Sequence, residues 1–330
     1  MVRPLHAADQ PALAALIVAA APALRLWDPA TSAAGWVDRP SGEEEHLLGL
    51  WRRSALIGAA RLVPGRRLRA RHAGALELAG APGEDLAPLV QAMVDLVDGW
   101  SDLARLEIEL PADHAALGAL AEAGFQVEVR REGRMMGGVD NLVLGRLRPG
   151  FTPRPAGGPP PWPSRRAAPE AQVIFREITE ADSPGVAALS TAPTAVWGTL
   201  QNLSSNDLFY TRRFHNTPPG NLILIVEVAG AVAGIGGLHP TPEPDVLVLG
   251  MGFHPDWQGR GLGRMLMAEQ LRRAAARGAR RVELSVWHDN TRAIALYQAS
   301  GFVAEGTRRY DGVRAGGHCS SLDMATRLPS

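Results

Sequence analysis

One stretch of this 330-residue chain combines residue types that suit anion chemistry, and it is the segment Gln258–Arg264. Glycine can adopt positive φ angles and lets the backbone come close to a ligand, while arginine can pair with two phosphate oxygens at once. Three glycines and two arginines within seven residues therefore predict a loop that binds a phosphate group. The segment consists of Gln258, Gly259, Arg260, Gly261, Leu262, Gly263 and Arg264.

The elements expected on either side of this loop are a strand and a helix. Val246–Phe253 is a run of eight residues without a charge, about the length of one buried strand, and His254–Asp256 ends it. From 262 to 277 apolar residues recur at helical spacing, and Gly278 is a stop signal. Because the first turn of a helix offers unpaired N–H groups and a positive dipole end, this order supports phosphate binding. The loop is neither a Walker A sequence nor a GxGxxG dinucleotide fingerprint.

The composition limits the class of protein. A length of 330 residues predicts about two domains, and 34 basic against 34 acidic residues point to neither nucleic acid nor a membrane surface as a partner. Every basic residue other than histidine is arginine, so arginine content alone says little about function. The single cysteine, Cys319, excludes an intrachain disulfide and a cysteine-based metal cluster, which fits a reducing, cytoplasmic compartment without a metal site.

The two halves of the chain repeat each other. Val2–Leu16 aligns with Phe175–Leu189 at an offset of 173, with seven identical positions, and Ala121–Phe125 aligns with Gln298–Phe302 at an offset of 177. A nearly constant offset over this length indicates duplicated domains rather than a solenoid. The apolar start of the chain resembles a secretory signal, but the repeat makes it the first strand and helix of copy one. No apolar run reaches the ~20 residues that span a bilayer.

The second copy alternates short strands with helices. A hairpin is expected over 222–238 with its turn at Ala229-Gly230, and a strand over 281–286 precedes a helix over 290–300. Hairpins and a strand–helix–strand unit together predict an α+β fold with a mixed sheet. We expect a first domain at 1–149, a Pro-rich linker at 150–171 that acts as a semi-rigid spacer, and a second domain at 172–330.

The loop pattern resembles the Gln/Arg-x-x-Gly-x-Gly/Ala signature of the GNAT acyltransferases, which cradles the pyrophosphate of acetyl-CoA. Leu284–Tyr297 looks like the second motif of that family, and Gly301-Phe302 looks like the pair that follows it. The resemblance covers about 155 residues of copy two, and reaches copy one through the repeat. It implies two tandem GNAT-like domains, each a mixed, mostly antiparallel sheet flanked by helices, and acetyl-CoA as the cosubstrate.

The resemblance also implies roles for single residues. Backbone groups of Gly252 and Phe253 would hold the thioester and the pantetheine arm, and the amides of Gln258–Arg264 would bind the pyrophosphate. Asn290 would contact the CoA arm, unless it serves only as a helix cap. Tyr297 would protonate the leaving thiolate, unless it only fills the core.

A general base is needed to take the proton of the attacking amine. Glu227 and His239 are the first candidates, ahead of Asp245 and His254, and an ordered water could relay the proton instead.

The loop sequence of copy one differs from that of copy two. At an offset of 176, Pro82–Pro88 aligns with the loop of copy two, so that Glu84 and Pro88 replace the two arginines of that loop. Asp85 and Ala87 replace two of its glycines, and a carboxylate there repels a pyrophosphate. Leu120 or Ala121 stands in place of the tyrosine. We therefore expect a degenerate first domain and one cofactor site per chain.

The acceptor is expected to be a small-molecule primary amine. Trp197–Gln201 resembles a Thr-Leu-Gln element of amino-acid N-acetyltransferases, and Glu305–Tyr310 looks like a later strand of theirs. The tandem architecture also resembles mycothiol synthase, which acetylates a cysteinyl pseudo-disaccharide with its second copy. A different class of function, a non-catalytic acetyl-CoA sensor, is the remaining alternative. The sequence does not fix the oligomeric state.

Overall fold

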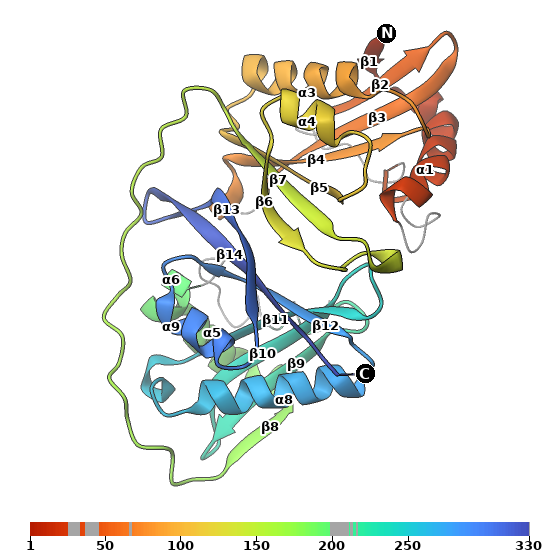
Figure 1. Ribbon diagram of the computed structural model, residues 1–330. Coiled ribbons are helices and arrows are strands. Elements are labelled where there is room, and N and C mark those ends of the chain that lie inside the picture. The colour runs from red at the N-terminus through yellow and green to blue at the C-terminus, as the bar shows by residue number, and fades with distance from the viewer. Residues whose placement is uncertain are drawn as a thin grey trace. The chain divides into compact units, whose positions relative to one another are not determined.

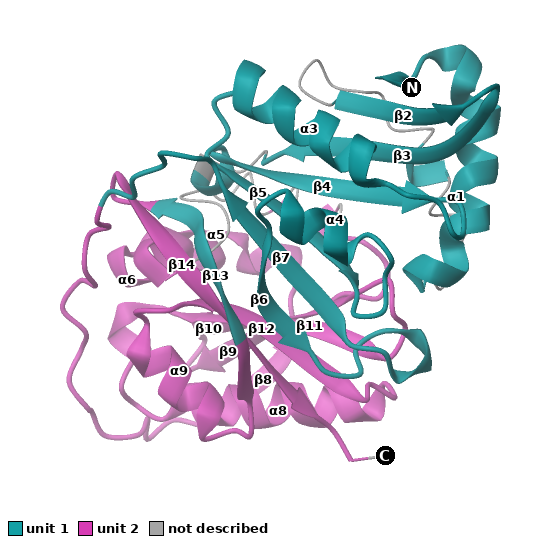
Figure 2. Ribbon diagram, turned by 45° about the horizontal axis from the view of Figure 1, so that its top comes forward, with its two compact units in different colours: residues 1–154, 306–313 teal, residues 155–305, 314–330 magenta. Residues whose placement is uncertain are grey.

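The computed structural model describes residues 1–25, 34–36, 46–65, 68–198, 211, 214–215 and 217–329. The chain divides into two compact units (Figure 2). Unit 1 consists of Met1–Arg154 together with Gly306–Val313, and unit 2 of Pro155–Glu305 together with Arg314–Ser330. The first unit therefore includes a short segment from near the C-terminus, which the ranges expected from the sequence did not contain.

Unit 1 is a sheet with helices on both faces. Its strands follow the order β1-β2-β3-β4-β5-β7-β6, and all neighbours are antiparallel except β4 and β5. The elements are β1 (Val2–Pro4), η1 (Ala7–Asp9), α1 (Gln10–Leu24), β2 (His46–Arg52), β3 (Ala55–Pro64), η2 (Leu68–Ala70), β4 (Ala73–Gly80), α3 (Ala87–Trp100), β5 (Arg105–Pro111), α4 (Leu117–Glu122), β6 (Gln126–Arg131), η3 (Met136–Gly138) and β7 (Asn141–Leu147).

Unit 2 repeats the first six strands of this order as β8-β9-β10-β11-β12-β14, with β11 and β12 as its parallel pair (Figure 1). The mixed, mostly antiparallel sheet that the sequence predicted is thus confirmed. The elements are β8 (Val173–Glu177), η4 (Glu180–Asp182), α5 (Ser183–Thr191), α6 (Pro193–Gly198), β9 (Leu222–Val228), β10 (Ala231–Pro240), β11 (Val246–Phe253), η5 (Pro255–Trp257), α8 (Leu262–Ala276), β12 (Arg281–Trp287), α9 (Thr291–Gln298), β13 (Val303–Arg314) and β14 (Gly317–Arg327).

Each sheet has a large apolar core on one face and a smaller helix layer on the other. In unit 1 the main core lies under α3 and α4, and α1 packs on the opposite face against β3 and β4. In unit 2 the main core lies under α8 and α9. A Cβ at Gly236 would meet Leu266 of α8, whereas one at Gly252 would meet Leu189 of α5, so α8 and α5 cover opposite faces.

The apolar start of the chain is part of unit 1. Ala7–Leu24 is long and apolar enough to cross a bilayer by length and composition, and 28% of it is buried. Leu13, Leu16 and Ile17 belong to the apolar cluster that joins α1 to β3 and β4. A core helix of a soluble domain and a signal sequence both meet the same criteria, so the helix is weak evidence for a membrane span.

An arginine–aspartate pair at the start of each copy shows the duplication in side-chain detail. Arg3 donates two hydrogen bonds to Asp9, at 2.7 and 2.8 Å, and Arg176 binds Asp182 with the same two distances. The hydrogen bond from Arg176 lowers the pKa of Asp182 to about 2. The pair ties the first strand of each copy to the start of its first helix.

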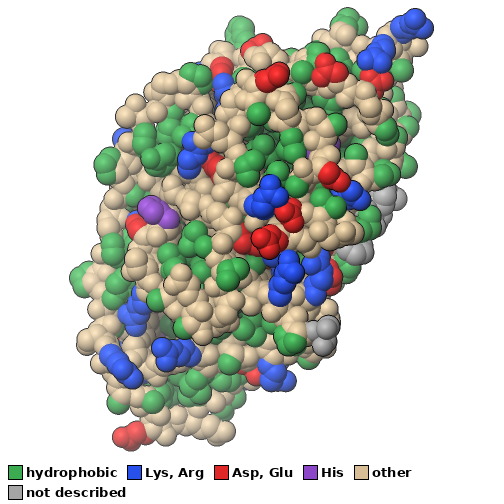
Figure 3. All heavy atoms as spheres, in the orientation of Figure 1, with side chains coloured by type: hydrophobic (Ala, Val, Ile, Leu, Met, Phe, Trp, Pro, Cys, Tyr) green, Lys and Arg blue, Asp and Glu red, His purple; other side chains and the backbone are tan. Residues whose placement is uncertain are grey.

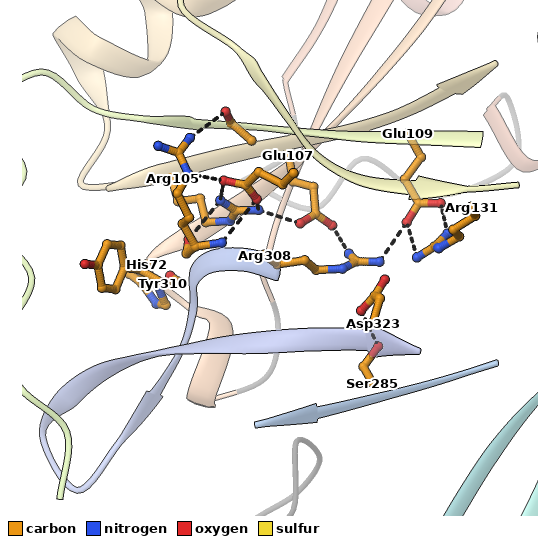
Figure 4. Close-up of polar contacts among 12 residues, drawn as sticks. His72, Arg105, Glu107, Glu109, Arg131, Ser285, Arg308, Tyr310 and Asp323 are labelled. Atoms are coloured by element: carbon orange, nitrogen blue, oxygen red, sulfur yellow. Dashed lines mark hydrogen bonds and ion pairs between the residues drawn. The ribbon is translucent and has the colours of Figure 1, made fainter. Parts of the chain in front are cut away.

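A buried ion cluster also occurs in both copies, on the last strand of the parallel pair. In each case one buried arginine binds two glutamates, one on its own strand and one on a later strand. In unit 1 the cluster extends to Arg308, which lies between Glu107 and Glu109 (Figure 4). The two clusters are Arg105 with Glu107 and Glu128, and Arg281 with Glu283 and Glu305.

The middle of β13 joins unit 1 through these charges. Gly306 pairs with Val129 of β6, Arg309 binds Glu128 at 2.7 Å, and the ring of His72 lies 2.7 Å from the carbonyl oxygen of Tyr310. Unit 1 is therefore completed by a strand segment that the chain reaches about 150 residues later.

Candidate functional site

The parallel strands of unit 2 separate along their length. β11 pairs with β12 only over Val246–Val248 and Arg281–Glu283, although both strands continue further. The ends of β11 and β12, at 249–253 and 284–287, therefore form no hydrogen bonds with each other. Strand ends that part in this way leave backbone groups for a ligand to use.

Along β11, the N–H and C=O groups of successive residues point alternately toward β10 and away from it. This alternation determines which backbone groups face the opening. The N–H of His254 donates to the carbonyl of Ala233, so the antiparallel register makes Gly252 and Ile235 a hydrogen-bonded pair. Phe253, one residue along, then directs its N–H and C=O away from β10. Of the two residues expected to offer backbone groups to the thioester, Phe253 has the required direction, and Gly252 points toward β10.

The loop after β11 forms an uncapped helix N-terminus. Gly259 and Gly261 have φ angles of 79° and 84°, and Gly261 is the N-cap of α8 without a side-chain cap. A Cβ at Gly261 would meet nothing within 4 Å, whereas one at Gly263 would lie 3.1 Å from Leu296 of α9. Gly263 thus serves helix packing, and Gly261 serves the turn. Leu262 anchors the helix in the core, where it is 1% exposed.

Gln258 fastens the loop to the rest of unit 2. Its Nε2 donates to the carbonyl of Phe253 and to the hydroxyl of Thr194, each at 2.9 Å. Its Oε1 is buried without a hydrogen-bond partner among the described residues. The side chain therefore positions the loop against β11 and α6, and the backbone rather than this side chain is left to bind phosphate.

The linker does not behave as the expected spacer, because residues 155–167 run along unit 2. We call this segment the strap. The N–H of Arg166 donates to the carbonyl of Gly259 at 3.0 Å, and Arg260 donates to the carbonyl of Ala167 at 3.2 Å. Arg260 also donates to the carbonyl of Asp256, so its guanidinium binds backbone oxygens of the loop and the strap. Arg264 is exposed in the first turn of α8.

Tyr297 lies on the face of α9 that packs against the core. Its side chain is 8% exposed, and its ring centroid is 6.0 Å from that of Phe302. Burial raises the pKa of Tyr297 to about 12, so the hydroxyl keeps its proton at any physiological pH. Because an ordinary thiol has a pKa near 8.5, full proton transfer to a thiolate would be uphill, and a hydrogen bond to the departing sulfur is the easier contribution.

Asn290 caps α9. Its Oδ1 accepts a hydrogen bond from the N–H of Ala293 at 3.3 Å, and the residue is 8% exposed. The capping role that the sequence left open is therefore observed, while the contact with the CoA arm stays a prediction.

Glu227 is held by a structural arginine. Arg176, which binds Asp182, also donates to Glu227 at 2.7 Å. At the equivalent position of β2, Trp51 stands under Arg3, with 4.4 Å between the guanidinium carbon and the ring centroid. Both copies therefore use this position to support the arginine, which favours a structural role for Glu227.

His239 lies on the α5 face of β10, beside a glycine surface. A Cβ at Gly237 would lie 2.5 Å from its Nε2, so the ring covers Gly237, and Gly250 on β11 is exposed with nothing within 4 Å of a Cβ. Nδ1 of His239 is hydrogen-bonded to Oδ1 of Asn221. An amide oxygen at Nδ1 favours the tautomer with a proton there, which puts the lone pair on Nε2. The role of His239 as the general base stays a prediction.

The other two base candidates have local partners. Nδ1 of His254 accepts a hydrogen bond from the N–H of Asp256 at the start of η5, and Asp245 is paired with Arg280. Among the described residues, no three His, Cys, Asp or Glu side chains are placed to hold a metal ion.

The loop of copy one is shorter and closed by its own carboxylate. Five residues, 81–85, separate β4 from the N-cap Leu86, whereas seven, 254–260, separate β11 from Gly261. Oδ1 of Asp85 accepts the N–H of Ala87 at 2.9 Å, inside the first turn of α3. Glu84 pairs with Arg52.

This geometry corrects the alignment of the two loops. The N–H groups of Leu89 and Val90 donate to the carbonyl of Leu86, as those of Arg264 and Met265 donate to that of Gly261. Leu86 therefore occupies the place of Gly261, and the offset of 176 was one residue too large at this point. The acid in the helix turn is nevertheless real, because Asp85 stands where Arg260 does.

A second equivalence resolves the position of the tyrosine. The N–H of Phe302 donates to the carbonyl of Tyr297, and that of Phe125 donates to the carbonyl of Leu120. Leu120, which is 0% exposed, is thus the counterpart of Tyr297. Of the acceptor element expected at 197–201, Trp197 is buried on α6 and 199–201 lie outside the described residues.

The contribution of the strap was not expected from the sequence. Its proline-rich sequence shows no periodic pattern. Its contacts with the loop use mainly backbone groups, which cannot be predicted from residue type. The available signals were Trp162, an aromatic side chain that the sequence led us to expect against a domain surface, and the adjacent Arg165 and Arg166.

Comparisons with known proteins agree with this geometry. A family model described as the acetyltransferase (GNAT) family matches residues 188–302. A mycothiol acetyltransferase of Saccharopolyspora erythraea is 31% identical over 228 residues, which are 66% of this chain and 67% of that protein. The L-amino acid N-acetyltransferase AaaT of Escherichia coli is 26% identical over 47% of this chain and 98% of its own. The structure of a GNAT-family acetyltransferase from Streptococcus pneumoniae covers 48% of this chain and 100% of its own, with 22% identity and a TM-score of 0.42.

Proposed function

Because this chain belongs to the GNAT family of acetyltransferases and uses acetyl-CoA as acetyl donor, we propose that its second copy acetylates the primary amine of a cysteinyl pseudo-disaccharide. The observation that supports this acceptor is the length of the match to a mycothiol acetyltransferase, since 228 residues exceed one copy. The match therefore includes parts of both copies, which supports an acceptor that a tandem protein uses.

The donor site in this proposal is the opening beside β11 and the loop that follows it. The N–H of Phe253 faces away from β10 and holds the pantetheine arm and thioester, while the C=O of Phe253 accepts the hydrogen bond from Gln258. The loop amides from Gln258 to Arg264 bind the pyrophosphate at the positive end of α8, where no side chain caps the helix. Asn290 contacts the CoA arm from the start of α9.

The reaction joins the amine nitrogen to the thioester carbon and breaks the carbon–sulfur bond. His239 accepts the proton that the amine loses, in preference to Glu227, whose carboxylate supports Arg176. Tyr297 donates a hydrogen bond to the departing thiolate, which then takes up a proton. Residues on β10, β11 and α9 thus act on the two ends of one transfer.

A second candidate acceptor is a free amino acid or another small amine. The similarity to an L-amino acid N-acetyltransferase supports it. That match covers 98% of the relative and 47% of this chain, which is about the length of copy two. Both acceptors offer a primary amine and need no nucleic acid or membrane. A cytoplasmic location fits both and is part of the proposal.

An amine panel with thiol release as its readout tests the proposal. We expect the purified chain to release CoA from acetyl-CoA fastest with a cysteinyl glycoside, and more slowly with cysteine or other free amino acids. Faster turnover of a free amino acid would favour the second acceptor. Absence of thiol release with every amine, despite acetyl-CoA binding, would contradict both.

A further inference from the structure

The strap makes a series of contacts along unit 2, and the last of them are with the cofactor loop. Near its start, Pro155 pairs with His318, and the carbonyl of Gly157 accepts hydrogen bonds from Trp197 and Arg314. A segment fixed at this many points is an ordered part of unit 2 rather than a loose spacer.

An aromatic contact fixes the middle of the strap. The ring of Trp162 meets that of Trp197 edge to face, with 5.5 Å between the centroids. Arg292, in the first turn of α9, lies 5.7 Å from the Trp162 ring and donates to the carbonyl of Pro163 at 3.3 Å. Trp162 thus places the following four residues directly beside the loop.

The loop is built to admit the strap. A Cβ at Gly259 would lie 2.5 Å from the carbonyl oxygen of Ser164, which no side chain could accept without a shift. The glycine at 259 is therefore required by the strap as well as by its φ of 79°. This differs from Gly261, where a Cβ would meet open space.

The strap binds the backbone carbonyls of the loop. The backbone N–H of Arg166 donates to the carbonyl of Gly259, and its guanidinium donates to the carbonyl of Asp256 at 2.9 Å, while in the other direction the guanidinium of Arg260 donates to the carbonyl of Ala167. In a trans peptide the C=O points opposite to the next N–H, and the described chain has no cis peptide. The N–H of Arg260 therefore points away from the strap.

From these contacts we propose that the strap is a positioning element of the phosphate end of the acetyl-CoA site, and that Arg166 is its main positioning residue. By holding the loop carbonyls on one side, Arg166 keeps the loop amides turned to the other, where a phosphate can accept their hydrogen bonds. This inference rests on the proposed function, because it assigns the loop to acetyl-CoA.

The charge around the loop suits the same ligand. Arg165 and Arg166 are exposed beside Arg260 and Arg264, and Asp256 is the one acid in the loop. In Figure 3 basic side chains gather at the lower left, over the part of unit 2 where the linker and α9 run. Four arginines beside a helix N-terminus favour a ligand with several phosphate charges.

Two substitutions at one position separate the backbone contact from the side-chain contact. Arg166→Ala removes the guanidinium and keeps the N–H, and Arg166→Pro removes both. We expect CoA to bind about threefold more weakly to the first variant and about tenfold more weakly to the second, as measured by calorimetry. Ala168→Pro is the matched control, since it adds a proline to the same linker at an exposed residue without a described hydrogen bond to the loop.

A phosphate-free donor distinguishes positioning from general damage. S-acetylpantetheine carries the thioester but no phosphate, so its kcat/KM should stay within twofold of wild type in both Arg166 variants. Equal losses with both donors, or CoA affinity unchanged in Arg166→Pro, would overturn the inference. Failure of the wild-type chain to bind CoA at all would instead overturn the proposed function.

Discussion

The two copies keep the same opening between parallel strands but differ in the loop behind it. β4 pairs with β5 only over Ala73–Ala75, as β11 pairs with β12 over three residues. Behind β4, however, Asp85 accepts the N–H of Ala87 and so fills the first turn of α3, whereas Gly261 leaves the first turn of α8 without a side-chain cap.

This difference shows that the fold and the chemistry depend on separate residues. The paired arginine and aspartate near each copy's start and the buried arginine–glutamate clusters hold the sheet together, and both copies have them. Cofactor binding depends on the few loop positions that differ. We therefore propose that copy one keeps the architecture as a scaffold and does not bind acetyl-CoA.

The largest effect is expected from placing a carboxylate at the N-cap of α8, one residue after the position that corresponds to Asp85. Gly261→Asp should weaken acetyl-CoA binding at least about a hundredfold, because a carboxylate at the N-cap repels the pyrophosphate. Aspartate tolerates a positive φ, so the chain should remain folded by circular dichroism. Calorimetry measures both affinity and stoichiometry, and wild type should bind one acetyl-CoA per chain.

Gly83→Asp in copy one is the matched control for this change. Gly83 has a φ of 77° and open space at its Cβ position, much like Gly261. An unchanged affinity is expected. Two acetyl-CoA molecules per wild-type chain, or equal effects of the two substitutions, would remove the contrast between the loops.

The next effect concerns Tyr297, whose counterpart in copy one is Leu120. Tyr297→Phe removes only the hydroxyl and should lower kcat about a hundredfold while acetyl-CoA affinity changes less than twofold. Steady-state kinetics and calorimetry together measure this separation. A variant with the wild-type rate at saturating substrate would return Tyr297 to a packing role.

The same hydroxyl predicts a pH effect on stability. Its pKa is about 12 in the folded protein and about 10 when unfolded, so the folded state holds the proton more tightly. This stability is complete below pH 10 and is lost as the pH rises toward 12, by roughly 2–3 kcal/mol. Denaturant unfolding of wild type and Tyr297→Phe between pH 9 and 12 should show the extra loss in wild type alone. Parallel curves would contradict the burial of the hydroxyl.

The smallest effect is expected at Glu227, where copy one has Trp51. Glu227→Gln keeps the shape and a hydrogen-bond acceptor for Arg176, so kcat/KM should stay within about twofold of wild type. His239→Gln, by contrast, should lower kcat far more, since it removes the proposed base. A large loss from Glu227→Gln with none from His239→Gln would exchange the two roles.

Local patterns were enough to predict most of unit 2. The uncharged run Val246–Phe253 forms β11 with the bounds expected, and the turn at Ala229-Gly230 has the two positive φ angles that its hairpin requires. The helix after the loop and the cap of α9 also follow from residue type and spacing. The loop itself could be located because glycine and arginine have few other reasons to cluster.

What could not be predicted depends on contacts without a sequence pattern. An alignment at one constant offset cannot show that the two loops differ in length by two residues. As a result, the alignment at Leu86 was wrong by one position. The strap contacts the loop largely through backbone groups, so its proline-rich composition predicted a spacer. The partner of Glu227 comes from β8, some fifty residues earlier, and spacing along the chain cannot show such a pair.

The inclusion of Gly306–Val313 in unit 1 has a consequence for synthesis of the protein. At roughly 5–20 residues per second, about 8–30 seconds separate the completion of Arg154 from the arrival of Gly306. Throughout that interval β6 is an open sheet edge, and Glu128 lacks its later partner Arg309. In a nascent chain of this protein the edge of β6 therefore stays open to pairing with other strands until most of the second half has been translated.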